Sequence, residues 1–331
     1  MNPMLSIVIP TYNRARMLKR AIDSALVAAP EDDVEVVVVP NGPHRGWVTV
    51  QASYLHEARV QWHPIERGQA CVARNHGLAC ASGDYVRFLD DDDYLLPQAA
   101  EQLRQLRLTG ADVATAPLAI ADAVGRLVHT QPLPTTDDFV EAALLSVCIN
   151  NMTAGCIFRR ASLAGLRWRE DVVLYDDYLW IIAVAQRAEL KWHRSEEPVA
   201  AYVEHDGPRL SRVARSTANS RPLLAAILDM NVYLNSECRG GSGRDRAAAS
   251  ALLTHAHSVF PASPFLLGSV IRKALEIAPD ARPLQSIFGA HRWLAKHLLA
   301  IEWAILPARY LTRSYRRIVW FSGLLRERFV R

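Results

Sequence analysis

Apolar runs of strand length alternate with amphipathic helical patterns along the first part of the chain. Leu5–Ile9 is rich in β-branched residues, and Ala15–Ala28 places its apolar residues at helical spacing. Val34–Val39 is almost continuous valine, which is typical of a strand buried on both faces of a parallel sheet. Further strands are expected at Val60–His63, Tyr85–Leu89 and Val113–Pro117, and further helices at Gly46–Glu57, Gly68–Ser82 and Pro97–Leu108. This order predicts an α/β domain with a doubly wound, mostly parallel sheet flanked by helices.

The pattern changes along the second part of the chain. Asp122–Thr136 is expected as a loop or hairpin, Thr153–Phe158 as a strand and Tyr178–Arg187 as a helix. Strand signals stop after Leu210, and Ala/Leu-rich helical patterns follow. These helices are expected at Arg215–Asn235 and Arg244–Phe260, with a flexible joint between them at Arg239–Gly243. Further helices are expected after residue 264, interrupted by Pro279, Pro283 and Pro307. We therefore expect an α/β domain over residues 1–212 and an all-helical region over residues 213–331.

Composition excludes several classes of protein. Half of the 331 residues are hydrophobic and 22% are charged, which excludes a disordered or collagen-like chain. The five cysteines form no CxxC pair, so neither a disulfide framework nor a zinc knuckle is expected. We expect a reducing, cytoplasmic location instead. The first residues resemble a strand more than a signal peptide, and no window of about 18 residues lacks charge, so no transmembrane helix is expected.

Positive charge is concentrated at one end of the chain. Residues 290–331 hold nine Lys/Arg and two Glu, a net +7, whereas the whole chain carries +4. The remaining residues are therefore slightly acidic, which argues against nucleic acid as a partner. In residues 313–331 six arginines flank an apolar core, a pattern that predicts an interfacial helix on an anionic membrane. The alternative is that this face packs on the rest of the protein.

Four consecutive aspartates, Asp90–Asp93, follow the strand Tyr85–Leu89. Adjacent carboxylates repel one another and cost stability unless a cation neutralises them. Hard divalent ions prefer oxygen ligands, and ligands of open α/β sheets bind at the carboxyl ends of strands. The tetrad is therefore a candidate metal site. The alternative is a solvated acidic turn before the helix at Pro97.

Two other segments are candidates for binding an anionic ligand. Gly68 opens a helix that carries Arg74 and Asn75, although an ordinary amphipathic helix with an exposed arginine would have the same pattern. In Pro10–Arg14, after the first strand, Thr11 or Asn13 can cap the next helix, and Tyr12 can hold a nucleotide base.

In order and spacing, the motifs Ser6–Arg14, Ala73–Leu78 and Gly83–Asp93 resemble glycosyltransferase family 2, whose members have the GT-A fold and use nucleotide sugars. The resemblance extends over residues 4–211. It implies a nucleotide-sugar half at about 1–117 and an acceptor half at about 118–212. It also implies a divalent metal, Mn²⁺ or Mg²⁺, at Asp90 and Asp92. The residues that we expect to contact the donor are Thr11, Tyr12, Asn13, Asn41, Arg74, Asp90, Asp91 and Arg209.

One turn departs from the family pattern. Where the family usually has an aspartate that reads the base, this chain has Pro40, followed by Asn41. Proline has no side-chain acceptor, so base recognition is expected to pass to Asn41 or to the backbone. A UDP-sugar is the expected donor, with the base left open.

Acidic and basic residues further along the chain complete the expected site. Leu174–Trp180 resembles the acidic pair of the family, which implies that Asp177 is the base of inverting transfer and that Asp176 replaces the usual Glu. Charges that favour a helix N-terminus are the alternative. Tyr202–Ser211 is similar to the element that closes the catalytic domain in this family. His205 is therefore a candidate ligand of the metal or the diphosphate, and the alternative is a structural role. Arg209 is a candidate partner of the leaving diphosphate. Three tryptophans are candidates for a sugar site or for the core: Trp168, Trp180 and Trp192.

The function predicted from these residues is metal-assisted, inverting transfer of a sugar from a nucleoside-diphosphate sugar to a surface-glycan or lipid-linked acceptor. The expected location is the cytoplasm or the inner face of the cytoplasmic membrane. One alternative is a nucleotidyltransferase acting on sugar phosphates, although Thr11–Asn13 lacks the Gly-rich basic loop of that class. Another is a catalytically weak binding protein of the same fold, which Pro40 favours and the retained acids oppose.

Overall fold

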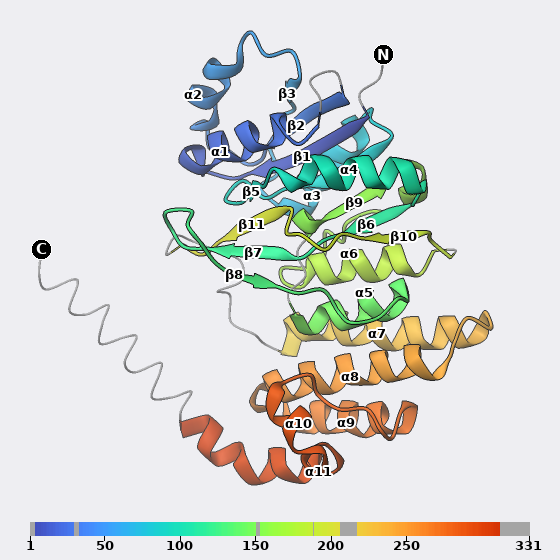
Figure 1. Ribbon diagram of the computed structural model, residues 1–331. Helices are drawn as coiled ribbons and strands as arrows, with labels where there is room; N and C mark the ends of the chain where they lie inside the picture. Colours follow the sequence, from blue (N-terminus) through green and yellow to red (C-terminus); the bar gives the residue numbers. More distant parts are fainter. Residues whose placement is uncertain (1–3, 30–32, 150–152, 188, 206–216, 312–331) are drawn as a thin grey trace, which may run out of the picture. The chain divides into compact units, whose positions relative to one another are not determined.

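The computed structural model describes residues 4–29, 33–149, 153–187, 189–205 and 217–311 (Figure 1). The chain divides into two compact units, Met1–Val213 and Ala214–Arg331. The expected domain boundary at residues 212 and 213 falls outside the described residues and stays a prediction.

A seven-stranded sheet forms the centre of the first unit, with the strand order β10-β6-β9-β4-β1-β2-β3. Its strands are β1 (Leu5–Thr11), β2 (Val34–Pro40), β3 (Val60–Trp62), β4 (Tyr85–Phe88), β6 (Val113–Thr115), β9 (Cys156–Arg159) and β10 (Trp192–Arg194). Neighbouring strands are parallel except around β9, which runs antiparallel to β4 and β6. Strand β1 lies between β2 and β4, so the sheet grows from it in both directions. In an open sheet, such a switch point is where ligands bind, beyond the carboxyl ends of the strands.

A smaller sheet brings a distant segment beside the acidic tetrad. Its strand order is β5-β11-β7-β8, formed by β5 (Tyr94–Leu95), β11 (Ala200–Val203), β7 (Leu118–Ala121) and β8 (Leu127–Gln131). Strands β7 and β8 form an antiparallel hairpin, one of the two forms expected for this region. Because β11 pairs with β5, the residues that end β11 lie next to those that follow β4.

Helices cover both faces of the large sheet, as the sequence predicts for a doubly wound domain. On one face, α1 (Ala15–Leu26) and α4 (Gln98–Thr109) join alternate strand residues in one core, whose members include Leu5, Ile7, Ile9, Leu18, Ile22, Val36, Leu103 and Leu106. On the other face α3 (Ala70–Cys80) contacts β1 directly, because a Cβ at Gly77 would lie 2.3 Å from Val8 Cγ1. On that side Phe88 packs against Trp168 and Trp180, whose rings stack at 4.7 Å. Trp168 and Trp180 are therefore core residues.

The remaining elements of the first unit differ from the expected ones in detail. The single helix expected at Gly46–Glu57 is α2 (Trp47–Gln51) followed by the 3₁₀ turn η2 (Ala52–Tyr54). The strand expected at Thr153–Phe158 begins with another 3₁₀ turn, η3 (Thr153–Gly155), and a third, η4 (Arg160–Leu163), follows β9. Two helices complete the unit: α5 (Phe139–Ile149) and α6 (Asp176–Ala185).

The described part of the second unit consists of helices and turns. It contains α7 (Thr217–Ser236), α8 (Ser242–Val259), η6 (Phe260–Ala262), α9 (Pro264–Ile277), α10 (Ser286–Ala290), α11 (Arg292–Lys296) and a helix over residues 298–311. The expectation that Pro307 interrupts a helix is wrong: it lies inside the last helix, which tolerates the missing N–H donor. The fully buried Glu302 contacts both His257 and Arg309. Among the described residues, no helix has the length and apolar character needed to cross a membrane.

Candidate functional site

Carboxylates gather at the carboxyl end of β4. Asp91, Asp92 and Asp93 are buried, whereas the Asp90 side chain is 39% exposed. One oxygen atom from each of Asp90, Asp92 and Asp93 lies within 4.8 Å of the others. Hard divalent ions such as Mg²⁺ and Mn²⁺ prefer a set of ligands made only of oxygen. This acidic triad therefore fits such an ion, and it contains Asp93, which the sequence did not single out as a ligand.

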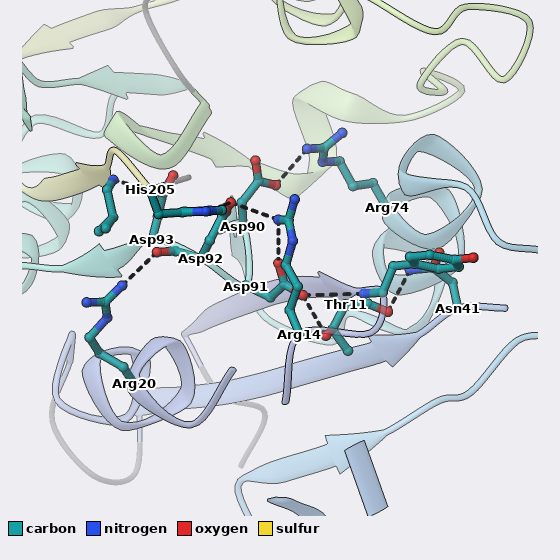
Figure 2. A network of polar contacts seen from close by, with 12 residues as sticks. Thr11, Arg14, Arg20, Asn41, Arg74, Asp90, Asp91, Asp92, Asp93 and His205 are labelled. Atoms are coloured by element: carbon teal, nitrogen blue, oxygen red, sulfur yellow. Dashed lines mark hydrogen bonds and ion pairs between the residues drawn. The ribbon is translucent and has the colours of Figure 1, made fainter. Parts of the chain in front are cut away.

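The loop after β1 binds the tetrad through Asp91. Thr11 Oγ1 donates to Asp91 Oδ2 at 2.6 Å, and Arg14 Nη1 donates to Asp91 Oδ1 at 3.0 Å and to Asp92 Oδ2 at 2.8 Å (Figure 2). Asn13 adopts a left-handed backbone conformation, with φ of 54°, between these two residues. Burial raises the pKa of Asp91 to about 7, an effect that Arg14 opposes and Asp92 reinforces. Asp91 therefore holds the loop in place.

The other two buried acids are held by the small sheet and by α1. His205 Nε2 lies 3.0 Å from Asp92 Oδ2, and the backbone N–H of Val203 donates to Asp93 Oδ1 at 2.9 Å. Arg20 reaches from α1 to donate to the backbone oxygen of Asp92 at 2.8 Å (Figure 2). The pairing of β11 with β5 thus brings His205 to the tetrad.

Arg74 connects the tetrad to a second pair of acids. Its Nη2 donates to Asp90 Oδ1 at 2.7 Å, its Nη1 donates to Asp176 Oδ2 at 2.7 Å, and Nη2 lies 4.0 Å from Asp177 Oδ1. The guanidinium lies over the Trp168 ring at 4.5 Å. Burial lowers the pKa of Arg74, but the carboxylates of Asp90 and Asp176 outweigh it and the net pKa is raised. This cation joins α3, the end of β4 and the start of α6.

Asp177 is half-buried beside Asp176 and Arg74. It lies in the first turn of α6, after Tyr175, which has a left-handed φ of 66°. Burial raises the pKa of Asp177, the charge of Asp176 raises it further, and Arg74 opposes both. Among the described residues, Asp177 Oδ1 has no hydrogen-bond donor. Backbone strain and perturbed carboxylates are features that gather at functional sites.

An aromatic surface lies beside the carboxyl ends of β1 and β2. A Cβ at Gly42 would lie 2.7 Å from Tyr12 Cε2, and one at Gly68 would lie 3.0 Å from it, so both glycines let the ring approach the backbone. The Tyr12 residue stays 48% exposed. Asn41 is buried, and its Nδ2 donates to the Thr11 backbone oxygen at 2.9 Å. Its amide nitrogen therefore stabilises the loop, while Tyr12 presents an open ring.

Most residues singled out in the sequence come together at this end of the sheet. They are Thr11, Tyr12, Asn13, Asn41, Arg74, Asp90, Asp91, Asp92, Asp176, Asp177 and His205. Arg209 lies outside the described residues. Trp192 donates its indole N–H to Thr115 Oγ1 at 2.9 Å. Sequence reasoning missed Arg14 and Arg20, and for Arg14 a signal existed, because it closes the first of the three motifs.

Comparisons with known proteins agree with this geometry. The model of the family "Glycosyl transferase family 2" matches residues 6–164. An uncharacterized glycosyltransferase of Rickettsia felis is 33% identical over 99 residues, 30% of this chain but only 16% of its own length. One from Nostoc sp. is 26% identical over 257 residues, 70% of this chain and 74% of its own length.

Solved structures share the fold. Staphylococcus aureus TarS, residues 1–349 in complex with UDP-GlcNAc, superposes with a TM-score of 0.68 at 17% identity, covering 95% of this chain and 92% of the other. The likeness supports a GT-A fold with a helical region after it, as expected from the sequence. Together with the mostly parallel sheet and the acidic site at its switch point, the family match identifies residues 6–164 as a glycosyltransferase family 2 domain.

Proposed function

We propose that the protein is a metal-assisted, inverting glycosyltransferase that moves a sugar from a nucleoside-diphosphate sugar to a hydroxyl group of its acceptor. One observation carries the proposal: Asp90 of the acidic triad and Asp176 of the acidic pair of α6 both bind a single buried arginine, Arg74. One group of carboxylates can hold a metal that binds the donor, and the other can supply a base for the acceptor hydroxyl.

Donor binding is assigned to the carboxyl ends of β1, β2 and β4. The exposed ring of Tyr12 offers a stacking surface for a nucleobase, and the backbone around Asn41 offers polar groups for its edge. A UDP-sugar bound to the structural neighbour TarS supports a nucleotide sugar as the donor class. We expect uridine, although Pro40 leaves the base less constrained.

The acidic triad is assigned to a divalent cation, Mn²⁺ or Mg²⁺. Such an ion offsets the negative charge of a departing diphosphate. His205 contacts Asp92 and can orient that carboxylate or serve as a further ligand. Arg14 and Arg74 balance part of the negative charge within the protein itself. Arg209 remains a candidate partner of the diphosphate.

Asp177 is assigned as the general base. Its carboxylate, whose Oδ1 has no hydrogen bond within the described structure, can accept the proton of an acceptor hydroxyl as the hydroxyl oxygen attacks the anomeric carbon from the face opposite the diphosphate. Asp176 engages Arg74 and so orients the acidic pair.

The acceptor is assigned to surface glycans or lipid-linked sugars, with peripheral contact at the inner face of the cytoplasmic membrane. Residues 313–331, the basic segment that we expect to contact lipid, lie outside the described residues. The helical unit supports this assignment, because it exposes Phe265, Trp293 and Leu311 at 82%, 61% and 73%. Aromatic and basic side chains favour the lipid–water interface.

A thermal-shift experiment tests the donor and metal assignments together. Wild-type protein is heated with a panel of nucleoside diphosphates, in Mn²⁺ and in EDTA, because a ligand raises Tm in proportion to ln(1 + [L]/Kd). We expect UDP to raise Tm in Mn²⁺ only. The variant Asp92→Asn should keep its own Tm and lose the shift.

Asp84→Asn is the matched control, because Asp84 is an exposed carboxylate at the opposite end of β4. It should respond to UDP and Mn²⁺ as wild type does. An equal shift in EDTA would contradict metal dependence, and no shift with any nucleoside diphosphate would contradict the donor class. A metal-dependent shift without transfer to any glycan acceptor would favour the catalytically weak binding protein.

A further inference from the structure

A second group of metal-ligating side chains lies outside the acidic site. His76 and Cys80 lie one turn apart on α3, and His63 directly follows β3, the edge strand of the large sheet. One candidate ligand atom from each residue lies within 4.8 Å of the other two. An i, i+4 pair on a helix presents both side chains to the same neighbour. Here that neighbour is the end of the edge strand.

The three side chains are open to an ion from solvent. His76 is exposed, whereas His63 and Cys80 are half-buried, and Cys80 is a free thiol. The two imidazole rings meet at an angle of 60°, with centroids 6.1 Å apart. Small rotations of exposed side chains bring ligands at this spacing onto one ion.

His63 is already held by polar neighbours. Its Nε2 lies 3.4 Å from Gln61 Oε1, while Gln61 Nε2 donates to Glu35 Oε2 at 3.1 Å. The contact leaves Nδ1 of His63 with its lone pair. A metal-ligating histidine usually donates its other ring N–H to an oxygen acceptor in this way, although here the acceptor is an amide and the carboxylate of Glu35 lies one residue further on.

We propose that His63, His76 and Cys80 form a second metal site, which binds a zinc-class divalent cation through two imidazoles and one thiolate. Nitrogen and sulfur ligands favour Zn²⁺ over Mg²⁺, whereas the all-oxygen acidic triad has the opposite preference. Water completes the tetrahedron. The bound ion links helix α3, which carries Arg74, to the edge strand β3 and thereby stabilises the first unit.

Cobalt is the probe, because Co²⁺ replaces zinc and gives an absorption band when a thiolate binds it. Full-length protein is titrated with Co²⁺ in excess Mg²⁺, which occupies the acidic triad. We expect a thiolate-to-cobalt band that saturates at one equivalent and disappears when Zn²⁺ is added. Cys80→Ser should abolish the band. His76→Asn should weaken Co²⁺ binding by about 10–100-fold or more, the loss that even an outer contact of a metal site causes.

Two variants serve as matched controls. Cys238→Ser removes an exposed thiol of the second unit, and His129→Asn removes an exposed imidazole on β8. Both should bind Co²⁺ as wild type does. Cys80→Ala provides a second thiol variant if the serine variant does not fold.

Zn²⁺ should also raise the Tm of wild-type protein and of both controls, but not that of His76→Asn. Absence of a thiolate band at one equivalent of Co²⁺, or its persistence in the Cys80 variants, would overturn the proposal. The proposal would also be overturned if the band formed only when Co²⁺ makes the protein dimerise, as measured by analytical ultracentrifugation, since the ligands would then come from two chains.

Discussion

Asp177 is the residue on which the proposed chemistry depends most directly. Replacing it by asparagine keeps the shape of the side chain but removes the basic carboxylate that accepts the proton. Asp177→Asn should lower the rate of sugar transfer by a factor of about 10² or more, as is typical when a general base is lost. Donor binding should change little, and stability should not fall, because the change removes like-charge repulsion with Asp176. Single-turnover transfer and a urea titration measure the two effects.

The pH profile separates a base from a structural carboxylate. Because the pKa of Asp177 is raised, its ionised form is populated only above that raised value. The wild-type rate should therefore fall as pH is lowered, with a midpoint above the ordinary range of aspartate, and Asp177→Asn should lose this dependence. Asp171→Asn, at an exposed aspartate a few residues earlier, should keep both rate and profile. A wild-type rate constant in Asp177→Asn would exclude the assignment.

The chemistry of the four aspartates predicted that a cation neutralises them, but not which arginines contact them. Four adjacent carboxylates indicate that a cation is required, and a metal ion was the expected one. In the structure, Arg14 and Arg74 already supply positive charge, and Arg14 lies 77 residues from Asp91 in sequence. A local pattern indicates which groups need neutralising. It does not indicate which distant arginine the fold brings to them.

Secondary-structure elements were predictable where the pattern was long and periodic. Strand β2 and helices α1 and α4 fall close to their expected ranges. Helix α5 was missed because Phe139–Ile149 is apolar on nearly every side and shows no helical period. Strands β5, β10 and β11, of two to four residues, were missed, although the equally short β3 and β6 were predicted from apolar runs that extend beyond them. Tertiary pairing creates these strands.

Glu35 shows how one side chain holds three elements together. This buried carboxylate on β2 accepts from Ser6 Oγ on β1 at 2.5 Å, and from the N–H and hydroxyl of Ser82 in the turn before β4 at 2.7 and 2.9 Å. In Glu35→Gln an amide NH₂ replaces one of the oxygens and leaves a buried donor unpaired. We expect a loss of about 1–3 kcal/mol in the free energy of unfolding, measured by urea denaturation.

Glu66→Gln is the comparison for this network. The Glu66 side chain is 84% exposed, and among the described residues it pairs only with the exposed Arg45. Its substitution should change the unfolding free energy by less than about 0.5 kcal/mol. Equal stability of the two variants would mean that the Glu35 contacts contribute nothing beyond those of an exposed ion pair.

At the scale of the whole molecule, the concentration of positive charge and the proposed catalytic site belong to different parts of the chain. The acidic site belongs to the first unit, whereas residues 290–331 carry a net +7. The exposed Phe265, Trp293 and Leu311 belong to the same unit as that charge. Electrostatic attraction to anionic lipid acts over about one Debye length, roughly 8 Å at physiological salt, so it requires the basic residues at the membrane surface.

The whole-molecule prediction is that residues 313–331 bind the protein to anionic membrane. On a helix, Trp320 and Leu324 lie on one face at i, i+4 spacing, with arginines on either side. Full-length protein should co-sediment with phosphatidylglycerol-containing vesicles at low salt, bind less well as salt rises, and ignore neutral vesicles. Truncation after residue 312 should abolish co-sedimentation while leaving metal-dependent nucleotide binding intact, which shows that the first unit is still folded. A full-length variant with Arg316 and Arg317 changed to Gln should bind anionic vesicles more weakly, because each basic residue near the surface contributes about 1 kcal/mol. If full-length protein stays in the supernatant at low salt, the segment has no membrane role, and the acceptor must reach the enzyme from solution.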